Sequence, residues 1–193
     1  MENKITKNEA IIKAIENLLL AYHEPDNNTG DLKYLIGQLI RKYDIPADNC
    51  HVSKAAMVRW NELTSNGNIK DFHYKDKVIC CNLENDKDFI LYKGASKEGD
   101  IITLSKNDSF EFRQMFHEDH VIPVSMIFAE LKKSTDIKSD KIKCILDKMH
   151  LCIILKEEDR KIGRTKGRSM DFDKTISHVY KEAEICIAPD KPV

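Results

Sequence analysis

The chain has 193 residues, of which 41% are hydrophobic and 33% are charged, and its formal net charge at pH 7 is −1. These values predict a globular protein with one substantial core, and they exclude a uniformly basic nucleic-acid coat. No apolar run approaches the length of a membrane span, and the N-terminal residues lack the apolar core of a signal peptide, so we expect no membrane partner and a cytoplasmic location.

The first third of the chain carries helical hydrophobic patterns. Apolar residues recur every three to four positions over 8–22, with Asn8 as the expected cap, and again over 32–43; a third helix is expected over 52–63. The second and third of these helices, joined by a short turn, could form a DNA-binding helix-turn-helix. We favour a helical region, residues 1–68, that buries its apolar faces, because the few basic residues of the third helix are what most surface helices carry.

The second region, residues 69–193, begins with a change of pattern. Short apolar or alternating segments separated by polar turns predict an antiparallel meander with strands at 78–81, 89–92, 101–104 and 110–112. The later pattern predicts a helix at 124–132, a polar loop at 133–140, an apolar strand at 151–155, a charged helix at 156–162 and a last helix at 173–183. The predicted class is therefore α+β.

Charge is distributed unevenly along the chain. Residues 132–168 contain twelve Lys or Arg and six Asp or Glu, a local net charge of +6, so the remainder carries about −7. Any phosphate-binding surface is therefore expected to be local and C-terminal.

Residues 116–123 read Phe-His-Glu-Asp-His-Val-Ile-Pro, with four ionisable side chains before an apolar run. Neighbouring side chains of an extended segment point to opposite faces, so Asp119 and His120 could reach different partners, one a metal and the other a water. The segment resembles the first motif of the HNH (ββα-metal) nucleases, in which Asp or Glu precedes His, two aliphatic residues and Pro. The second half is similar: His150 precedes the apolar strand, which runs into a helix carrying Asp159. The resemblance covers residues 116–162, about a quarter of the chain.

The resemblance implies a role for each matching residue. His120 would be the general base that deprotonates the attacking water, and Asp119 would bind the metal. Asp159 would be the second metal ligand, with Glu158 taking its place if the match is shifted by one residue. His150 falls on the middle Asn of the family, which holds the loop bearing the base.

This sequence departs from the family pattern at several points. His at the middle position and Asp at the final one make it a variant. None of the six cysteines forms the Cys-x-x-Cys pair with which many family members bind zinc, so no structural zinc is expected. His117 and Glu118 lack the spacing of the His-Glu-x-x-His protease helix, and we expect them to flank the site without a chemical role.

The residue types suit phosphodiester hydrolysis on their own terms. Imidazole is a base that titrates near neutrality, and a cation can stabilise the charge that develops on the phosphate. Two carboxylates with water and phosphate oxygens suit Mg²⁺ or Mn²⁺, with one ion expected per active site.

A run of basic residues lies directly beyond Asp159. We expect it to grip DNA phosphates, the alternative being a solvated charge run. Its members are Arg160, Lys161, Arg164, Lys166 and Arg168.

The predicted protein has an N-terminal helical region and a C-terminal nuclease core that hydrolyses DNA, as restriction-type and homing-type HNH endonucleases do. A homodimer would be the natural form if both strands of a duplex are cut. Two alternatives stay open: a nuclease of the same core that acts on RNA or as a toxin, and a non-catalytic nucleic-acid-binding or interaction protein that uses the helices of residues 32–63.

Overall fold

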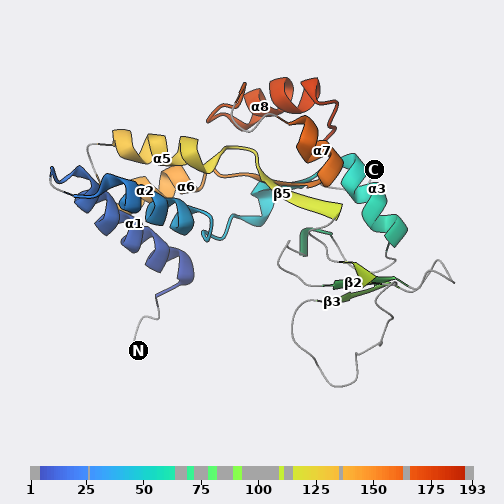
Figure 1. Ribbon diagram of the computed structural model, residues 1–193, viewed down its shortest axis with the longest axis horizontal. Coiled ribbons are helices and arrows are strands. Elements are labelled where there is room, and N and C mark those ends of the chain that lie inside the picture. Colours follow the sequence, from blue (N-terminus) through green and yellow to red (C-terminus); the bar gives the residue numbers. More distant parts are fainter. Residues whose placement is uncertain are drawn as a thin grey trace, which may run out of the picture. The chain divides into compact units, whose positions relative to one another are not determined.

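In the computed structural model, the residues described are 5–25, 27–63, 69–71, 78–81, 89–92, 109–110, 115–134, 137–162 and 166–189 (Figure 1). The chain divides into two compact units. The first unit consists of Met1–Asn49, His120–His150 and Arg164–Ser177. The second unit consists of Cys50–Asp119, Leu151–Gly163 and His178–Val193. Each unit therefore draws on separated stretches of the chain.

The first unit is helical. Its helices are α1 (Lys7–His23), α2 (Thr29–Ile40), α5 (Val124–Lys133), α6 (Ser139–Leu146) and the short α8 (Phe172–Thr175). Helix α1 packs on α2 and α6, and α5 packs on the same two helices, so the four lie side by side (Figure 1). They enclose a core of aliphatic side chains, among them Ile15, Leu19, Ile36, Leu131 and Leu146.

Two details of these helices differ from the sequence-based expectation. Helix α1 is capped by Thr6, whose hydroxyl accepts from the Glu9 N–H while the Glu9 carboxylate accepts from the Thr6 N–H. Asn8, the expected cap, instead exchanges hydrogen bonds with the backbone of Asp44. The polar loop expected at 133–140 is also too long, because α6 begins at Ser139. The charged residues of α6 obscure its short apolar face in the sequence.

The second unit contains a three-stranded mixed sheet in the order β1-β6-β5. Strand β1 (Cys50–Val52) pairs in parallel with β6 (Leu151–Leu155), and β5 (Phe116–His120) lies on the other side of β6. Because the sheet is mixed, β5 runs antiparallel to β6. The expected strand at 151–155 is thus confirmed, and the mixed helix and strand content confirms the α+β class.

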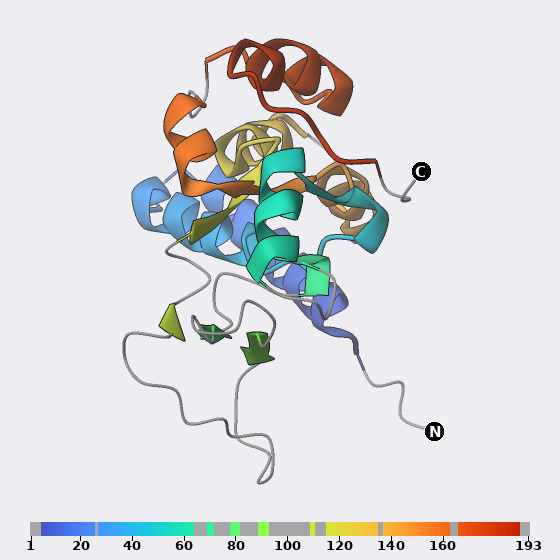
Figure 2. The same ribbon diagram turned by 90° about the vertical axis from the view of Figure 1, so that its right-hand side faces the viewer.

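Two helices pack on the central strand of this sheet. They are α3 (Lys54–Leu63) and α7 (Lys156–Lys161), and both contact β6 (Figure 2). The core of the unit includes Trp60 of α3 and Phe116 of β5, whose rings meet edge to face with centroids 5.9 Å apart. This contact fixes the start of β5 against α3.

The helix-turn-helix interpretation is wrong. Between α2 and α3 lie a 3₁₀ turn, Ala47–Asn49, and strand β1, so no short turn joins the two helices. Val52, expected in the third helix, pairs with Ile153 in the sheet. The β-branched residue and its apolar neighbourhood suit a strand at least as well as a helix, and tertiary pairing decides between them.

A second sheet in this unit is antiparallel, in the order β3-β2-β4. Its strands are β2 (Val78–Cys81), β3 (Phe89–Tyr92) and β4 (Ser109–Phe110). The expected strands at 78–81 and 89–92 are therefore confirmed, and β4 includes the first residue of the one expected at 110–112. Residues 111–112 and the expected strand at 101–104 lie outside the described residues.

The last described residues of the second unit are joined to β1 by main-chain hydrogen bonds. The helix expected at 173–183 is present over 172–182, with a π-helical turn, Ile176–Tyr180, between α8 and two further α-helical residues. Beyond it, the Lys54 N–H donates to the Cys186 carbonyl at 2.7 Å and the Ala188 N–H donates to the Val52 carbonyl at 2.8 Å. Among the described residues, no helix combines the length and hydropathy needed to cross a membrane.

Candidate active site

Strand β5 carries the first motif. Phe116 is buried in the core of the second unit, and the alternation of the strand puts His117 and Asp119 together on the opposite face. Only 8% of Asp119 is exposed. A buried carboxylate needs hydrogen-bond partners, so the groups around Asp119 matter to its orientation.

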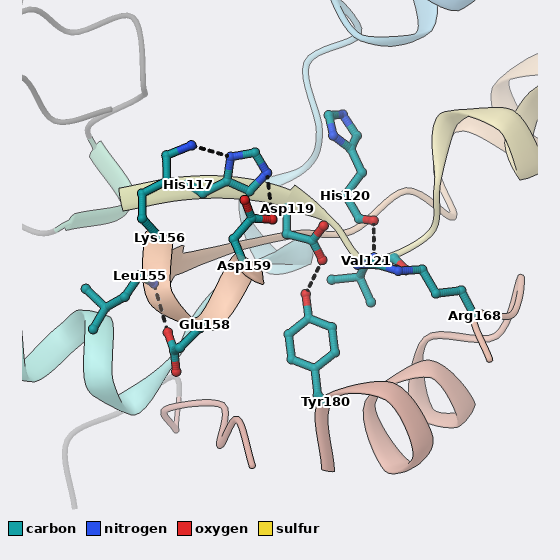
Figure 3. Close-up of polar contacts among 10 residues, drawn as sticks. All are labelled: His117, Asp119, His120, Val121, Leu155, Lys156, Glu158, Asp159, Arg168 and Tyr180. Carbon is teal, nitrogen blue, oxygen red and sulfur yellow. Dashed lines mark hydrogen bonds and ion pairs between the residues drawn. The ribbon is translucent and has the colours of Figure 1, made fainter. Parts of the chain in front are cut away.

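Tyr180 is the partner of Asp119. Its hydroxyl donates to Asp119 Oδ2 at 2.6 Å, and the tyrosine side chain is fully buried (Figure 3). Nearby, burial raises the pKa of the Cys152 thiol well above its ordinary value, and the charges of Asp119 and Glu158 raise it further. Cys152 is therefore a neutral thiol at pH 7.

His117 connects β5 to α7. Its Nε2 lies 3.6 Å from Asp159 Oδ1, and its Nδ1 lies 3.5 Å from Lys156 Nζ (Figure 3). The His117 and Asp159 side chains are 37% and 36% exposed. Asp159 is therefore beside the first motif and open to solvent, although forty residues separate it from Asp119 in the sequence.

Glu158, the neighbouring acid, is used differently. Its Oε2 accepts from the Ser53 hydroxyl at 2.6 Å and from the Leu155 N–H at 2.8 Å, and only 8% of the residue is exposed. The Ser53 hydroxyl in turn accepts from the Ala56 N–H in the first turn of α3. Glu158 thus caps α7 and links it to α3, and of the two acids Asp159 has the more accessible carboxylate.

His120 ends β5 and leads into a turn that belongs to the first unit. One guanidinium nitrogen of Arg168, Nη1, donates to the carbonyl oxygens of His120 at 2.7 Å and Val121 at 3.2 Å (Figure 3). The Val121 N–H donates to the His150 carbonyl at 3.0 Å. The main chain on the C-terminal side of the proposed base is therefore held at three atoms.

His150 makes a main-chain hydrogen bond and a ring-stacking contact. The ring stacks on Phe172 with centroids 4.2 Å apart and planes at 23°. The preceding residues are held by Asn49, whose side-chain amide donates to the Asp147 and Met149 carbonyls. The described link from His150 to the turn after His120 is thus a main-chain one, from the Val121 N–H to the His150 carbonyl.

The basic residues beyond Asp159 fall into different environments. Arg160, Lys161 and Lys166 are exposed, whereas Arg168 is partly buried and bonded to the turn. Arg164 lies outside the described residues.

The donor set bears on whether a divalent metal fits. The described part of the chain contains no group of three or more His, Cys, Asp or Glu side chains that could hold a metal ion. Mg²⁺ commonly takes one or two carboxylates and completes its shell with water and substrate phosphate oxygens. The carboxylates of Asp159, 36% exposed, and Asp119, 8% exposed, are the kind of oxygen donor that such an ion takes.

Two residues contact the acids of this site although the sequence pattern gave them no role there, His117 and Tyr180. His117 was expected only to flank the site, and the one available signal was its position two residues before Asp119, on the same face of β5. Tyr180 follows Asp119 by 61 residues, and nothing in the sequence connects the two.

No family model, curated protein or solved structure matches this chain.

Proposed function

We propose that this protein is a metal-dependent endonuclease of the HNH type that hydrolyses DNA phosphodiester bonds. The main support is the contact between His117 and Asp159, which brings the helix α7 beside the strand that ends in Asp119 and His120. The order of elements also agrees with the proposal, because β6 runs antiparallel to β5 and leads directly into α7. Strand, strand and helix in that order are the elements of a ββα-metal core.

In this proposal Asp119 and Asp159 hold one Mg²⁺ or Mn²⁺. The bound ion supplies positive charge that stabilises the phosphate as its charge develops. The Tyr180 hydroxyl donates to one oxygen of Asp119 and so fixes the orientation of the carboxylate. His120 accepts the proton of the attacking water.

His117 has a supporting part. Lys156 Nζ can only donate, so a neutral His117 ring that accepts from it at Nδ1 carries its proton on Nε2, which faces Asp159. A neutral imidazole in this tautomer directs an N–H toward the Asp159 carboxylate. That arrangement restrains the carboxylate without neutralising it, as outer hydrogen bonds do for metal ligands.

The exposed cations of α7 suit a polyanionic substrate. Arg160 and Lys161 directly follow Asp159 and would contact phosphates on either side of the bond that is cut. Binding should therefore weaken steeply as salt is raised.

The test is cleavage of supercoiled plasmid by the purified full chain with Mg²⁺ or Mn²⁺. Wild type should nick or linearise the plasmid, and EDTA should stop it. Replacing the base, His120→Ala, should lower the rate by about 10²- to 10⁴-fold. His23→Ala, which removes an exposed histidine of α1, is the matched control and should cut as wild type does.

Two results would overturn the proposal. One is a wild-type protein that cuts no plasmid with either metal; the other is a His120→Ala variant that cuts as fast as wild type. Single-stranded DNA and RNA, tested in parallel, define the substrate, and faster cleavage of RNA than of DNA would contradict the DNA assignment.

A further inference from the structure

The turn from His120 to Pro123 joins β5 to α5 and carries the proposed base at its first position. Arg168 Nη1 donates to the His120 and Val121 carbonyls of this turn, and the Val121 N–H donates to the His150 carbonyl. A terminal guanidinium nitrogen has two N–H bonds, and here each has a carbonyl acceptor. The side chain of residue 168 therefore fixes the peptide groups on the C-terminal side of His120.

The backbone around Arg168 is itself restrained. Gly167 has a φ of 78°, in the left-handed region that residues with a Cβ rarely adopt, so the chain can turn sharply before Arg168. On the other side, the Ser169 N–H donates to the Thr175 hydroxyl at 2.9 Å, and that hydroxyl donates back to the Ser169 carbonyl at 3.2 Å. Thr175 is fully buried. Arg168 thus extends from a fixed point on the chain.

Arg168 differs in this respect from its neighbour Lys166. Lys166 is exposed, as a side chain that contacts a phosphate backbone should be. Arg168 is partly buried, and its short 2.7 Å bond to the His120 carbonyl is a charge-assisted hydrogen bond. Two cations two residues apart therefore have different partners.

We propose that Arg168 is a positioning residue for His120 and not a DNA contact, an inference that rests on the proposed nuclease function. Holding the carbonyls of His120 and Val121 restricts the backbone dihedrals at the base and so restricts the direction of its imidazole. Misplacing a reacting group by about 1 Å can cost on the order of 10²-fold in rate, so a residue that touches no substrate can still control kcat.

The experiment compares Arg168→Lys, Arg168→Gln and Lys166→Ala in the full chain, with plasmid cleavage measured over a range of DNA and salt concentrations. Lysine keeps the charge but replaces the planar two-proton donor with a flexible ammonium. We expect both Arg168 variants to lose about 10- to 100-fold in kcat, with KM and the salt dependence near wild type. Lys166→Ala should keep kcat and reduce the slope of log affinity against log salt by about 1.

A second readout does not depend on cleavage. The imidazole resonances of His120, assigned by comparison with His120→Ala, should be sharp in wild type. They should shift and broaden in Arg168→Lys while the thermal unfolding midpoint and the other histidine signals stay in place.

The outcomes separate the two proposals. If wild type does not cut but the His120 signals respond to Arg168→Lys, the nuclease proposal is wrong and the positioning contact is real. The positioning proposal is wrong, and Arg168 is a phosphate contact, if wild type cuts and Arg168→Lys keeps the wild-type kcat. The same conclusion follows if Arg168→Gln changes only KM and the salt slope.

Discussion

The turn after His120 and the face between β5 and α7 are held in different ways. At the turn, the acceptors are main-chain carbonyls, which receive Arg168 and the Val121 N–H. At the β5–α7 face, the acceptors are the side-chain carboxylates of Asp119, Glu158 and Asp159. The turn should therefore depend on residue 168. The other face should depend on which acid stands at each position.

The largest expected effect in that comparison comes from Asp159→Ala. Because we propose Asp159 as a direct metal ligand, this substitution should cost at least about 10²-fold in plasmid cleavage, the upper end of what loss of an outer-shell partner costs. Mn²⁺ affinity, measured by calorimetry, should fall with it, while the unfolding midpoint changes little because the carboxylate is partly exposed.

Glu157→Ala is the matched control for this change, because Glu157 is an exposed acid on the same helix. It should keep both activity and Mn²⁺ affinity. If Asp159→Ala bound Mn²⁺ as tightly as Glu157→Ala does, Asp159 would not be a ligand.

Glu158→Ala should have the opposite profile. It leaves the Ser53 hydroxyl and the Leu155 N–H without their carboxylate acceptor, so it should lower the free energy of unfolding by about 1–3 kcal/mol, measured by urea titration. Glu158→Gln keeps one acceptor oxygen and should lose less. If Glu158→Ala were as stable as wild type, the hydrogen bonds of Glu158 would not stabilise the fold.

The smallest expected effect concerns Asp147, a third carboxylate whose work is structural. Burial alone would raise its pKa, but hydrogen bonds from Lys143 and Tyr43 outweigh this and lower it. The same carboxylate, together with burial as the larger cause, raises the pKa of Tyr43. A lowered pKa means that Asp147 stabilises the fold above its unfolded-state pKa, near about 3.9, and that this contribution is lost as pH falls through the folded-state pKa.

Asp147→Asn should therefore have a lower unfolding midpoint than wild type at about pH 6, and the difference should shrink as pH falls below about 4. Thermal unfolding followed by circular dichroism between these pH values measures it. Asp48→Asn, at an exposed acid, is the control. A difference between Asp147→Asn and wild type that stayed constant with pH would show that the charge is not responsible.

Strong periodic patterns predicted much of the fold. The apolar stripe of α1 and the apolar run of β6 could be read from spacing, because each element is long enough or apolar enough to outweigh local alternatives. The helix α7 was expected from the run of charged residues directly after β6. The resemblance to the HNH motif suggested Asp159 as the acid that meets the first motif, and in the structure its Oδ1 lies 3.6 Å from His117 Nε2.

Other features had no sequence signal. Strand β1 has only three residues, and its identity depends on pairing with β6, about a hundred residues later. Glu158 is buried because its carboxylate caps α7, whereas the carboxylate of Asp159, the next residue, is partly exposed. The partner of Arg168 could not be predicted because a carbonyl acceptor is present at every residue, so the sequence does not mark it.

The hydrogen bonds from the last described residues also set an order of events during synthesis. Residues 180–188 are translated after all the strands they support. Among them, Tyr180 holds Asp119, and the Cys186 carbonyl and the Ala188 N–H form hydrogen bonds beside β1. Because the chain is made from its N-terminus, these bonds can close only after residues 180–188 have been translated. A growing chain of this protein would therefore carry its acids before it could orient them.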